Sequence, residues 1–414
     1  MEHHHSDKYP SYSRELHSSL RVQTNMMKPE LTRGELHRYA RHIALPEVGL
    51  EGQVRLKSGR VLCVGAGGLG SPLTLYLAAA GIGTLGIVDY DSVDMSNLQR
   101  QILYGTADVG RSKLDSADDR LRDVNPFVEI IKHETRLSSE NAIDILQGYD
   151  VVIDGTDNFP TRYLVNDACV LTGTPNIYGS VFRWEGQVSV FATEDGPCYR
   201  CLFHEPPPPG LVPNCAEGGV LGVLPGIIGS MQAMETVKLL LGVGDTLVGR
   251  LLIFDALEMS WREVRLRKNP ECPVCSDQPT QRGLIDYEAF CGLSSSKVSS
   301  GEIEEETIEE IEPEALVELI GSTEPPFLID VRDPWEWAVS SLADQGARLI
   351  PVEEIDDRIP EIPQDMTVVV YCRSGKRGLT AAHLLKNAGY RRVFNLSGGI
   401  LGWAESVEPG LPVV

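Results

Sequence analysis

Residues Val61–Pro72, with the sequence VLCVGAGGLGSP, decide the fold of the first part of the chain. Val61–Val64 is a short apolar run typical of a buried strand, and the glycines after it lead into a helix that tolerates Pro72 in its first turn. Glycines let a phosphate approach the backbone closely, and a helix N-terminus supplies free N–H donors and positive potential. The stretch therefore predicts a nucleotide-binding strand–turn–helix unit.

Apolar runs with helical periods between them continue through residues 31–282. Those expected to form buried strands are Val61–Val64, Thr84–Asp89, Val128–Ile131, Val151–Asp154 and Leu251–Phe254. Strands separated by helices predict a doubly wound, mainly parallel sheet, which is the Rossmann-like α/β class. The most apolar run, Val220–Leu241, is interrupted by Pro225, Gln232, Glu235 and Lys238, so we expect a buried helix rather than a membrane span.

The C-terminal part of the chain predicts a second, smaller α/β domain over residues 306–414. Its strands are expected at Phe327–Val331 and Thr367–Tyr371, with a helix from about Gly378 to Asn387. Residues 283–305 are expected to be a linker, because the serine-rich stretch Ser294–Gly301 within them cannot bury enough apolar surface to order itself. Residues 1–30 are expected to be a polar tail that lies outside the fold.

The charge and the cysteine count exclude several classes of protein. Of 414 residues, 37 are Lys or Arg and 59 are Asp or Glu, which gives a formal net charge of −22. This charge repels phosphate backbones and anionic lipid, so we expect no bulk nucleic-acid partner and no membrane partner. Nine cysteines, an odd number in a chain without an export signal, favour metal binding or thiol chemistry in the cytoplasm over a disulfide framework.

A second group of nucleotide-contacting candidates follows the glycine-rich turn. Asp89 ends the next predicted strand, 19 residues after Gly70, where its carboxylate can accept hydrogen bonds from ribose hydroxyls. This much also fits a nicotinamide or flavin dehydrogenase. The polar segment beyond it carries amides and cations that suit a triphosphate better than a nicotinamide ring, and its candidates are Asp91, Ser96, Asn97, Leu98, Gln99, Arg100 and Lys113.

A magnesium ligand is expected after the strand that ends at Asp154. Asp157 and Asn158 follow that strand on the crevice side of such a sheet, where Asp157 could hold Mg²⁺. Taken singly, Arg100 and Lys113 could be solvated surface cations and Asp157 a helix cap. Together and in this order, these residues favour a site for ATP and Mg²⁺.

Four cysteines form two C-x₂-C pairs that predict a zinc site. The pairs are Cys198 with Cys201 and Cys272 with Cys275. One pair alone could be a redox dithiol, whereas two pairs supply the four thiolates of a closed tetrahedral zinc site. Such a site has no open coordination position, so we expect structural Zn²⁺ that joins distant segments of one domain.

A reactive cysteine is expected in the second domain. Cys372 follows the strand Thr367–Tyr371, and the loop Arg373, Ser374, Gly375, Lys376 and Arg377 leads from it into a helix. Backbone N–H groups, the helix N-terminus and three cations would lower the pKa of this thiol and hold an anion. Such a loop serves phosphatases and sulfurtransferases alike, but the short spacing from Cys372 to Arg377 gives a ring that suits a persulfide better than a phosphate.

Residues 31–275 resemble the ubiquitin-activating family in its bacterial form, the MoeB and ThiF adenylyltransferases. The stretches that carry the resemblance are Arg38–Ile43, Gly65–Gly70, Asp89–Asp91, Ser96–Arg100, Asp154–Asn158 and the two cysteine pairs. The resemblance implies that ATP activates the C-terminal glycine of a ubiquitin-like carrier. It also implies that ATP or Mg²⁺ contacts Gly68, Asp89, Asn97, Arg100, Lys113 and Asp157, and that Arg41 reaches the phosphates of a partner subunit in a homodimer.

Cys215 is a second candidate for a working thiol. It follows the stiff segment Pro206–Gly210 and precedes the long apolar run, in a loop that could reach a bound substrate tail. A lone cysteine is more often a small buried side chain. The match to the cysteine-bearing loop of the adenylyltransferase family favours a functional Cys215, which would attack the activated carrier or resolve a disulfide-linked intermediate.

Residues 306–414 resemble rhodanese through Asp330–Glu336, the Cys372 loop and Asn395–Trp403. One departure is that Ser341–Gln345 replaces the usual Gly-His-Ile segment, which leaves the packing of that segment open. An adenylating domain joined to a rhodanese domain is similar to the molybdopterin-synthase type of adenylyltransferase/sulfurtransferase. The similarity implies adenylation of a carrier of the MoaD, ThiS or Urm kind with a C-terminal Gly-Gly, followed by sulfur transfer from a Cys372 persulfide to give a thiocarboxylate.

Other functions remain open from the sequence. The sulfur donor to Cys372 would be a cysteine desulfurase or thiosulfate. An enzyme that activates a protein modifier for conjugation would instead use Cys215 as a thioester site, and a scaffold would use neither cysteine. Molybdopterin, thiamine, cysteine synthesis and tRNA thiolation use similar carriers, and the sequence does not choose among them.

Overall fold

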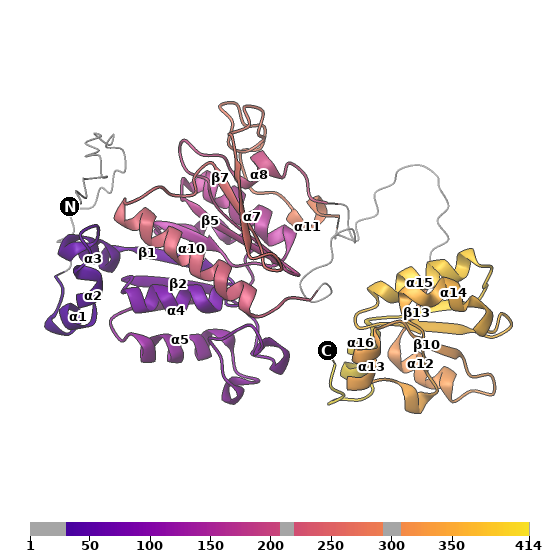
Figure 1. The fold of residues 1–414 in the computed structure, drawn as a ribbon. Coiled ribbons are helices and arrows are strands. Elements are labelled where there is room, and N and C mark those ends of the chain that lie inside the picture. Colours follow the sequence, from indigo (N-terminus) through magenta and orange to yellow (C-terminus); the bar gives the residue numbers. More distant parts are fainter. Residues whose placement is uncertain (1–29, 208–218, 293–307, 414) are drawn as a thin grey trace, which may run out of the picture. The chain divides into compact units, whose positions relative to one another are not determined.

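The computed structural model describes residues 30–207, 219–292 and 308–413 (Figure 1). The chain divides into two compact units, Met1–Ser296 and Lys297–Val414. Cys215 lies outside the described residues, as do most of the expected N-terminal tail and the second half of the expected linker.

The first unit is built on an eight-stranded sheet in the order β3-β2-β1-β4-β5-β6-β7-β8. Strands β1 to β5 are parallel, and β6 to β8 continue the sheet in antiparallel pairs. The strands are β1 Arg60–Val64, β2 Thr84–Asp89, β3 Glu129–Glu134, β4 Val151–Asp154, β5 Asn176–Phe182, β6 Glu185–Phe191, β7 Arg250–Asp255 and β8 Ser260–Arg265. The mainly parallel α/β class is confirmed, and all five predicted strands are present, although the last of them, β7, belongs to the antiparallel part.

Helices cover both faces of the parallel strands. Val61 and Cys63 of β1 contribute to one apolar cluster, which includes α4 and α10, while Leu62 and Val64 contribute to another, which includes α7. Alternate side chains are thus buried on opposite faces, and for this reason β1 is apolar at successive positions. The helices of this unit are α1 Arg33–Arg38, α2 Ala40–Ile43, α3 Gly49–Ser58, α4 Gly70–Ala80, α5 Lys113–Val124, α6 Ala142–Leu146, α7 Phe159–Thr172, α8 Tyr199–Leu202, α10 Val223–Leu241 and α11 Tyr287–Phe290, with 3₁₀ turns at Met95–Asn97 and Thr106–Asp108.

The long helix α10 is the buried helix predicted from Val220–Leu241. Its polar interruptions have partners inside the unit: Gln232 Nε2 donates to the carbonyls of Asp154 and Ile177, and Glu235 accepts from the N–H of Leu247. These hydrogen bonds satisfy polar groups that burial would otherwise penalise. Among the described residues, no helix is long and apolar enough to cross a membrane.

The ordered part of the first unit extends past residue 282. Tyr287 in α11 is buried, and its hydroxyl donates to Asp167 Oδ2 at 2.8 Å. Phe290 packs against the same core as Tyr163. The stretch expected to be a linker therefore begins with a segment that is anchored on the first unit, because its apolar side chains, among them Tyr287 and Phe290, pack against the core of that unit.

The second unit contains a five-stranded parallel sheet in the order β11-β10-β12-β13-β9. Val368 and Val370 of β12 face one apolar cluster, and Val369 and Tyr371 face the other, so both faces are covered again. Its elements are β9 Glu309–Ile311, α12 Pro313–Ile320, β10 Phe327–Asp330, α13 Pro334–Val339, β11 Arg348–Leu349, α14 Ile355–Arg358, β12 Val368–Tyr371, α15 Lys376–Asn387, β13 Val393–Leu396 and α16 Gly399–Ser406, with 3₁₀ turns at Ala343–Gln345, Val352–Glu354 and Ile359–Glu361. The predicted strands and the predicted helix of this domain are confirmed.

The glycine-rich turn packs too tightly for a side chain at Gly70, and this generates a prediction. A Cβ atom there would lie 2.1 Å from the carbonyl oxygen of Gly65, so Gly70→Ala should lower the free energy of unfolding of the first unit by about 1–3 kcal/mol. Gly283→Ala is the matched control, because an added Cβ at Gly283 meets nothing within 4 Å. Urea denaturation of both variants measures the difference, and equal midpoints would contradict the close approach.

Candidate functional site

The glycine-rich turn after β1 is held against the end of β2 by one carboxylate. Asp89 accepts hydrogen bonds from the N–H of Ala66 through Oδ2 and from the N–H groups of Tyr90 and Asp91 through Oδ1, at 2.8–2.9 Å. A carboxylate offers about four acceptor positions, so one remains for a ligand hydroxyl. Gly65 has a φ of 95°, which lets the backbone turn sharply at the end of the strand. Asp89 is therefore fixed where the sequence predicts a ribose contact.

The segment Asp94–Arg100 folds beside the same turn. Asp94 Oδ1 accepts from the N–H of Ser96, Asn97 Oδ1 accepts from the N–H of Asp94, and Arg100 Nη1 donates to the carbonyl of Ser96 at 3.1 Å. A Cβ on Gly68 would lie 3.6 Å from Arg100 Cγ. The arrangement brings the Arg100 side chain to the glycine-rich turn.

Leu98 and Gln99 from the predicted set serve the packing of this segment. Leu98 is half-buried against the large apolar cluster. The carbonyl oxygen of Gln99 touches Gly222 at the start of α10, where a Cβ would lie 1.9 Å away. These contacts hold the segment between the turn and α10.

Lys113 is held at this edge of the sheet by an ion pair. Its side chain is only 7% exposed, and Nζ lies 2.7 Å from Asp91 Oδ2. The N–H of Lys113 also donates to the carbonyl of Asp91. Lys113 is thus not a solvated surface cation, and Asp91 orients it.

The turn after β4 places Asp157 next to the glycine-rich turn. The N–H of Gly155 donates to the carbonyl of Val64, and a Cβ on Gly155 would lie 3.1 Å from the carbonyl oxygen of Gly65. Asn158 caps α7, because its Oδ1 accepts from the N–H of Thr161. Asp157 itself is exposed at this turn. The helix cap is Asn158, which leaves the Asp157 carboxylate available for a ligand.

Arg41 lies on α2, near the amino-terminal ends of the strands and therefore at the opposite side of the sheet from the glycine-rich turn. Its neighbour Tyr39 packs under Gly81, which precedes β2, and the Tyr39 hydroxyl accepts from Asn125 Nδ2, which precedes β3. Figure 1 shows α1, α2 and α3 grouped at one end of the unit. The glycine-rich turn lies at the other ends of these strands, so within one chain the structure does not bring Arg41 to the nucleotide residues.

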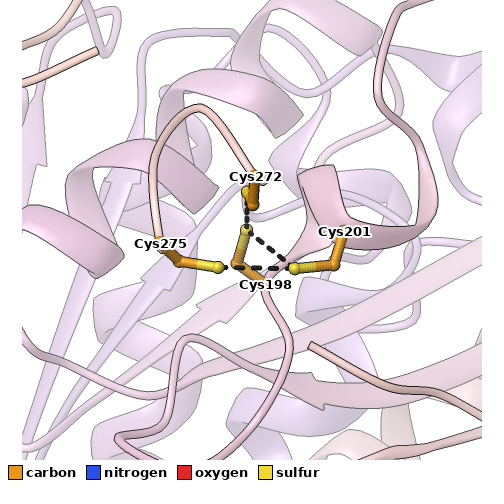
Figure 2. Close-up of side chains that lie close together, drawn as sticks. All are labelled: Cys198, Cys201, Cys272 and Cys275. Carbon is orange, nitrogen blue, oxygen red and sulfur yellow. Dashed lines mark hydrogen bonds between the residues drawn. The ribbon is translucent and has the colours of Figure 1, made fainter. Parts of the chain in front are cut away.

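The four predicted zinc ligands gather into one cluster (Figure 2). The sulfur–sulfur distances are 3.5 Å for Cys198–Cys272, 3.9 Å for Cys198–Cys201 and 3.3 Å for Cys201–Cys275, and all four sulfurs lie within 4.8 Å of one another. Tetrahedral zinc–thiolate bonds of about 2.3 Å require sulfur–sulfur separations of about 3.8 Å. The donor set and its dimensions therefore fit Zn²⁺.

A buried ion pair supports this cysteine cluster, and the sequence alone did not indicate it. Arg200, between two of the ligands, donates from Nε and Nη2 to Asp167 of α7 at 2.8–3.1 Å. The guanidinium lies over the rings of Tyr163 and Phe290. Asp167 also accepts from Tyr287 and Gln281, so it joins α7, the cysteine loop and α11.

The Cys372 loop in the second unit is fixed by its backbone. Gly375 has a φ of 93° at the start of α15, and its carbonyl accepts from Asn395 Nδ2 at 3.1 Å. The carbonyl of Cys372 accepts from the N–H of Ile400 at 2.8 Å, and Gly399 touches the same oxygen. The Cys372 side chain is buried at the end of β12, with Arg373 half-buried and Ser374 and Lys376 exposed.

Arg377 is bound to an acidic residue that the sequence reasoning left without a role. Its Nη1 and Nη2 donate to Glu336 Oε2 and Oε1 at 2.6 and 2.7 Å, which is bidentate pairing. Glu336 is 3% exposed. Arg377 therefore fixes the loop to α13, and its guanidinium is already engaged by a carboxylate.

The segment that departs from the usual rhodanese pattern packs into the core. Leu342 is buried, and its N–H donates to the Tyr371 hydroxyl at 3.1 Å. The carbonyl of Ser340 accepts from Arg332 Nη2, and Arg332 also pairs with Asp330 at 2.7 Å. These contacts show how the Ser341–Gln345 segment packs, which the sequence left open.

The cysteine cluster predicts metal content. Purified protein should contain about one zinc ion per chain, and Cys272→Ser should reduce both the zinc content and the melting temperature, because three thiolates hold zinc less tightly than four. Cys291→Ser replaces a buried cysteine outside the cluster and should keep its zinc. Elemental analysis checks both, and a zinc-free wild-type chain that melts unchanged with a chelator would contradict the assignment.

The Glu336–Arg377 pair predicts a loss of stability in acid. Burial would raise the pKa of Glu336, but hydrogen bonds from Arg377 and the N–H of Asp333 lower it below its usual value. A carboxyl of this kind contributes stability above its unfolded pKa of about 4.3, and the contribution is lost as the pH falls through the lower folded pKa. Glu336→Gln should thus lower the unfolding free energy by about 1–3 kcal/mol at neutral pH and by less in acid.

Urea denaturation of the full chain at several pH values measures this difference. Asp333→Asn is the matched control, since its carboxylate is 57% exposed and lies 3.6 Å from Arg377 Nη1. It should have a smaller effect. If the difference in unfolding free energy between Glu336→Gln and the wild type did not shrink below the usual pKa of glutamate, about 4.3, the Glu336–Arg377 pair would not be the source of that stability.

Both parts of the chain match families of known proteins. Residues 39–274 match the ThiF family, and residues 312–406 match the rhodanese-like domain. The chain is 48% identical over 391 residues to the probable adenylyltransferase/sulfurtransferase MoeZ of Mycobacterium tuberculosis, over 92% of this chain and 96% of that protein. It is 42% identical over 398 residues to the adenylyltransferase and sulfurtransferase MOCS3 of Culex quinquefasciatus, over 93% and 90% of the two chains.

A shorter relative and a solved structure are also similar to this chain. The sulfur carrier protein adenylyltransferase of Thermus thermophilus is 57% identical over 267 residues, which cover 63% of this chain and 98% of that protein. The crystal structure of E. coli MccB has a TM-score of 0.52 at 19% identity, over 58% of this chain and 73% of that one, and so shares the fold. The chain therefore belongs to the ThiF family, carries a C-terminal rhodanese-like domain, and is by this relationship an adenylyltransferase and sulfurtransferase.

Proposed function

We propose that this enzyme adenylates the C-terminal glycine of a ubiquitin-like sulfur-carrier protein and then converts it to a thiocarboxylate. The observation that carries the proposal is that one chain holds both a nucleotide edge, with Asp89, Lys113 and Asp157, and a cysteine loop at Cys372. The Thermus relative, which is 57% identical over 267 residues, is named as a sulfur carrier protein adenylyltransferase. The carrier would end in Gly-Gly.

The nucleotide edge suits adenylyl transfer. The carrier carboxylate attacks the α-phosphorus of ATP, the bond to the β-phosphate oxygen breaks, and pyrophosphate leaves. Negative charge builds on the phosphate oxygens during this step, so cations that are already in place stabilise it. Arg100 beside the glycine-rich turn and Lys113, oriented by Asp91, are such cations, and Asp157 would hold Mg²⁺.

A homodimer would complete this site. Arg41 is exposed on α2 at the opposite edge of the sheet, so only the Arg41 of a second copy could reach the phosphates. Helices α4 and α10 pack against each other and expose large apolar side chains, with Tyr76 at 61%, Met234 at 59% and Val223 at 66% exposure. A two-fold contact through these helices would bury them.

Sulfur transfer would use Cys372. A sulfur donor, such as a cysteine desulfurase or thiosulfate, gives Cys372 its outer sulfur. That sulfur attacks the carrier's acyl carbon, AMP leaves, and the carrier is joined to Cys372 by an acyl disulfide. A dithiol reductant, or Cys215 acting with a second thiol, then supplies two electrons that cleave the S–S bond and release the thiocarboxylate. Dividing the substitution into two steps replaces hydroxide by better leaving groups.

The cysteine cluster would hold a structural Zn²⁺ in this scheme. Four thiolates close the coordination shell, so the metal would not contact the substrate. It would tie the segment around Cys198 to the one around Cys272, which are far apart in the sequence. These segments flank the buried Arg200–Asp167 pair.

The mass of the carrier tests the proposed function. Incubation with ATP, Mg²⁺, a sulfur donor and a reductant should add about 16 Da to the correct carrier, through exchange of an oxygen for a sulfur. Cys372→Ala should keep carrier-dependent exchange of pyrophosphate into ATP but lose the mass gain, whereas Asp157→Ala should lose both. Carriers that remain unchanged with persulfidated wild-type enzyme, across every candidate tested, would refute the proposal.

A further inference from the structure

Arg162 is a buried cation next to the nucleotide edge, and the proposed function gives it no role. It lies in the first turns of α7, directly after the turn that carries Asp157, and its side chain is only 10% exposed. A buried guanidinium loses its hydration, so it persists only where protein groups replace the water. The hydrogen-bond partners of Arg162 therefore indicate which part of the structure it stabilises.

Arg162 differs from the other two buried arginines in the described part of the chain. Arg200 and Arg332 each donate two or more hydrogen bonds to one carboxylate, at 2.7–3.1 Å. The nearest carboxylate to Arg162 is that of Asp154, with 3.7 Å between Nε and Oδ2. Within the described part of the chain, both of these atoms are buried without a hydrogen-bond partner. Carboxylate pairing is thus not what fixes Arg162.

The hydrogen bonds of Arg162 go to the turn and to the neighbouring strand. Nη2 donates to the carbonyl of Thr156 at 3.0 Å, Nη1 donates to Ser180 Oγ of β5 at 3.3 Å, and the guanidinium lies over the Tyr178 ring at 5.2 Å. The N–H and Oγ1 of Thr156 both donate to Asp154 Oδ1, at 2.9 and 2.6 Å. The peptide groups on both sides of Thr156 are therefore tied, one to Asp154 and the other to Arg162.

This anchoring reaches Asp157 directly, because the carbonyl of Thr156 and the N–H of Asp157 belong to one peptide group. The residue on the far side, Asn158, is fixed as the cap of α7. Gly155 is packed against the carbonyls of Val64 and Gly65. The backbone around Asp157 is thus held on both sides, while its side chain stays exposed.

We propose that Arg162 is a positioning residue for the magnesium-nucleotide site, which it serves by holding the Thr156–Asp157 peptide so that the Asp157 carboxylate faces the metal. The inference rests on the proposed function, since it takes Asp157 as a metal ligand. A flexible carboxylate must lose conformational freedom when it binds a cation, and a fixed backbone reduces that loss. Arg162 would act through the turn and would not touch the nucleotide.

Asp154 adds a second reason for a guanidinium at this position. Burial raises the pKa of Asp154, the exposed Asp157 carboxylate raises it further, and Arg162 opposes both effects. Without the cation, Asp154 would take up a proton more readily, and a protonated Oδ1 would be a weaker acceptor for Thr156. The turn would then lose an anchor on each side.

The experiment compares Arg162→Gln and Arg162→Lys with the wild-type full-length chain. The melting temperature is measured at fixed ATP while Mg²⁺ is titrated, and carrier-dependent pyrophosphate exchange is measured over the same range. Arg162→Gln should need about tenfold more Mg²⁺ for half of the thermal shift and half of the maximal exchange rate, which corresponds to about 1.4 kcal/mol. Arg162→Lys should recover part of the loss, because an ammonium keeps the charge but not the two-armed geometry.

Arg332→Lys is the matched control, since it alters another buried arginine, in the other unit, and should leave the Mg²⁺ requirement unchanged. A folded Arg162→Gln chain with the wild-type Mg²⁺ requirement would overturn the inference, as would failure of both Arg162 variants to fold, which would make the residue a support of the fold. Failure of the proposed function looks different: the wild type then shows no exchange with any carrier, while the Mg²⁺-dependent thermal shift still reports on Arg162.

Discussion

The contact between two backbone turns is the constraint on which the nucleotide edge depends. The turn after β1 and the turn after β4 meet without side chains between them: the N–H of Gly155 donates to the carbonyl of Val64, and a Cβ on Gly155 would lie 3.1 Å from the carbonyl oxygen of Gly65. Parallel pairing of β1 with β4 brings the two strand ends to the same place. Because both turns are anchored to each other, Asp89 and Asp157 are presented from one rigid edge.

The sequence predicted the elements whose signal is local. An apolar run buried on both faces, as in β1, or a glycine-rich turn before a helix, needs no knowledge of distant residues. Strand β8 gave no such signal, because every residue from Ser260 to Arg265 is exposed, and the strand is defined only by its pairing with β7. The C-x₂-C spacing predicted the sulfur cluster although the two pairs lie far apart in the chain, because two such pairs supply the four thiolates of a zinc site and both the cysteines and their spacing are visible in the sequence.

The roles of single polar residues were harder to predict, because a role depends on the partner. Lys113 and Arg100 were expected near the nucleotide, but the sequence did not show that Asp91 holds the first of them. Asn158 was counted as a ligand candidate together with Asp157, and the structure makes it the helix cap. Arg162 was not singled out in the sequence, and Glu336 was noted only as the last residue of the rhodanese-like stretch Asp330–Glu336. A lone arginine or glutamate is usually solvent-exposed, and the burial and partners of these two residues come from tertiary packing.

Tyr199 connects the cysteine cluster to the buried Arg162 side chain. The residue lies between the ligands Cys198 and Cys201, its N–H donates to Asn166 of α7, and its phenol adjoins the Arg162 guanidinium, which lowers the pKa of that phenol against the larger rise caused by burial. A single side chain therefore spans the distance from the metal-binding loop to the cation behind the nucleotide turn. A displacement of the Cys198–Cys201 loop would therefore reach the Arg162 side chain, and with it the turn that carries Asp157, through one residue.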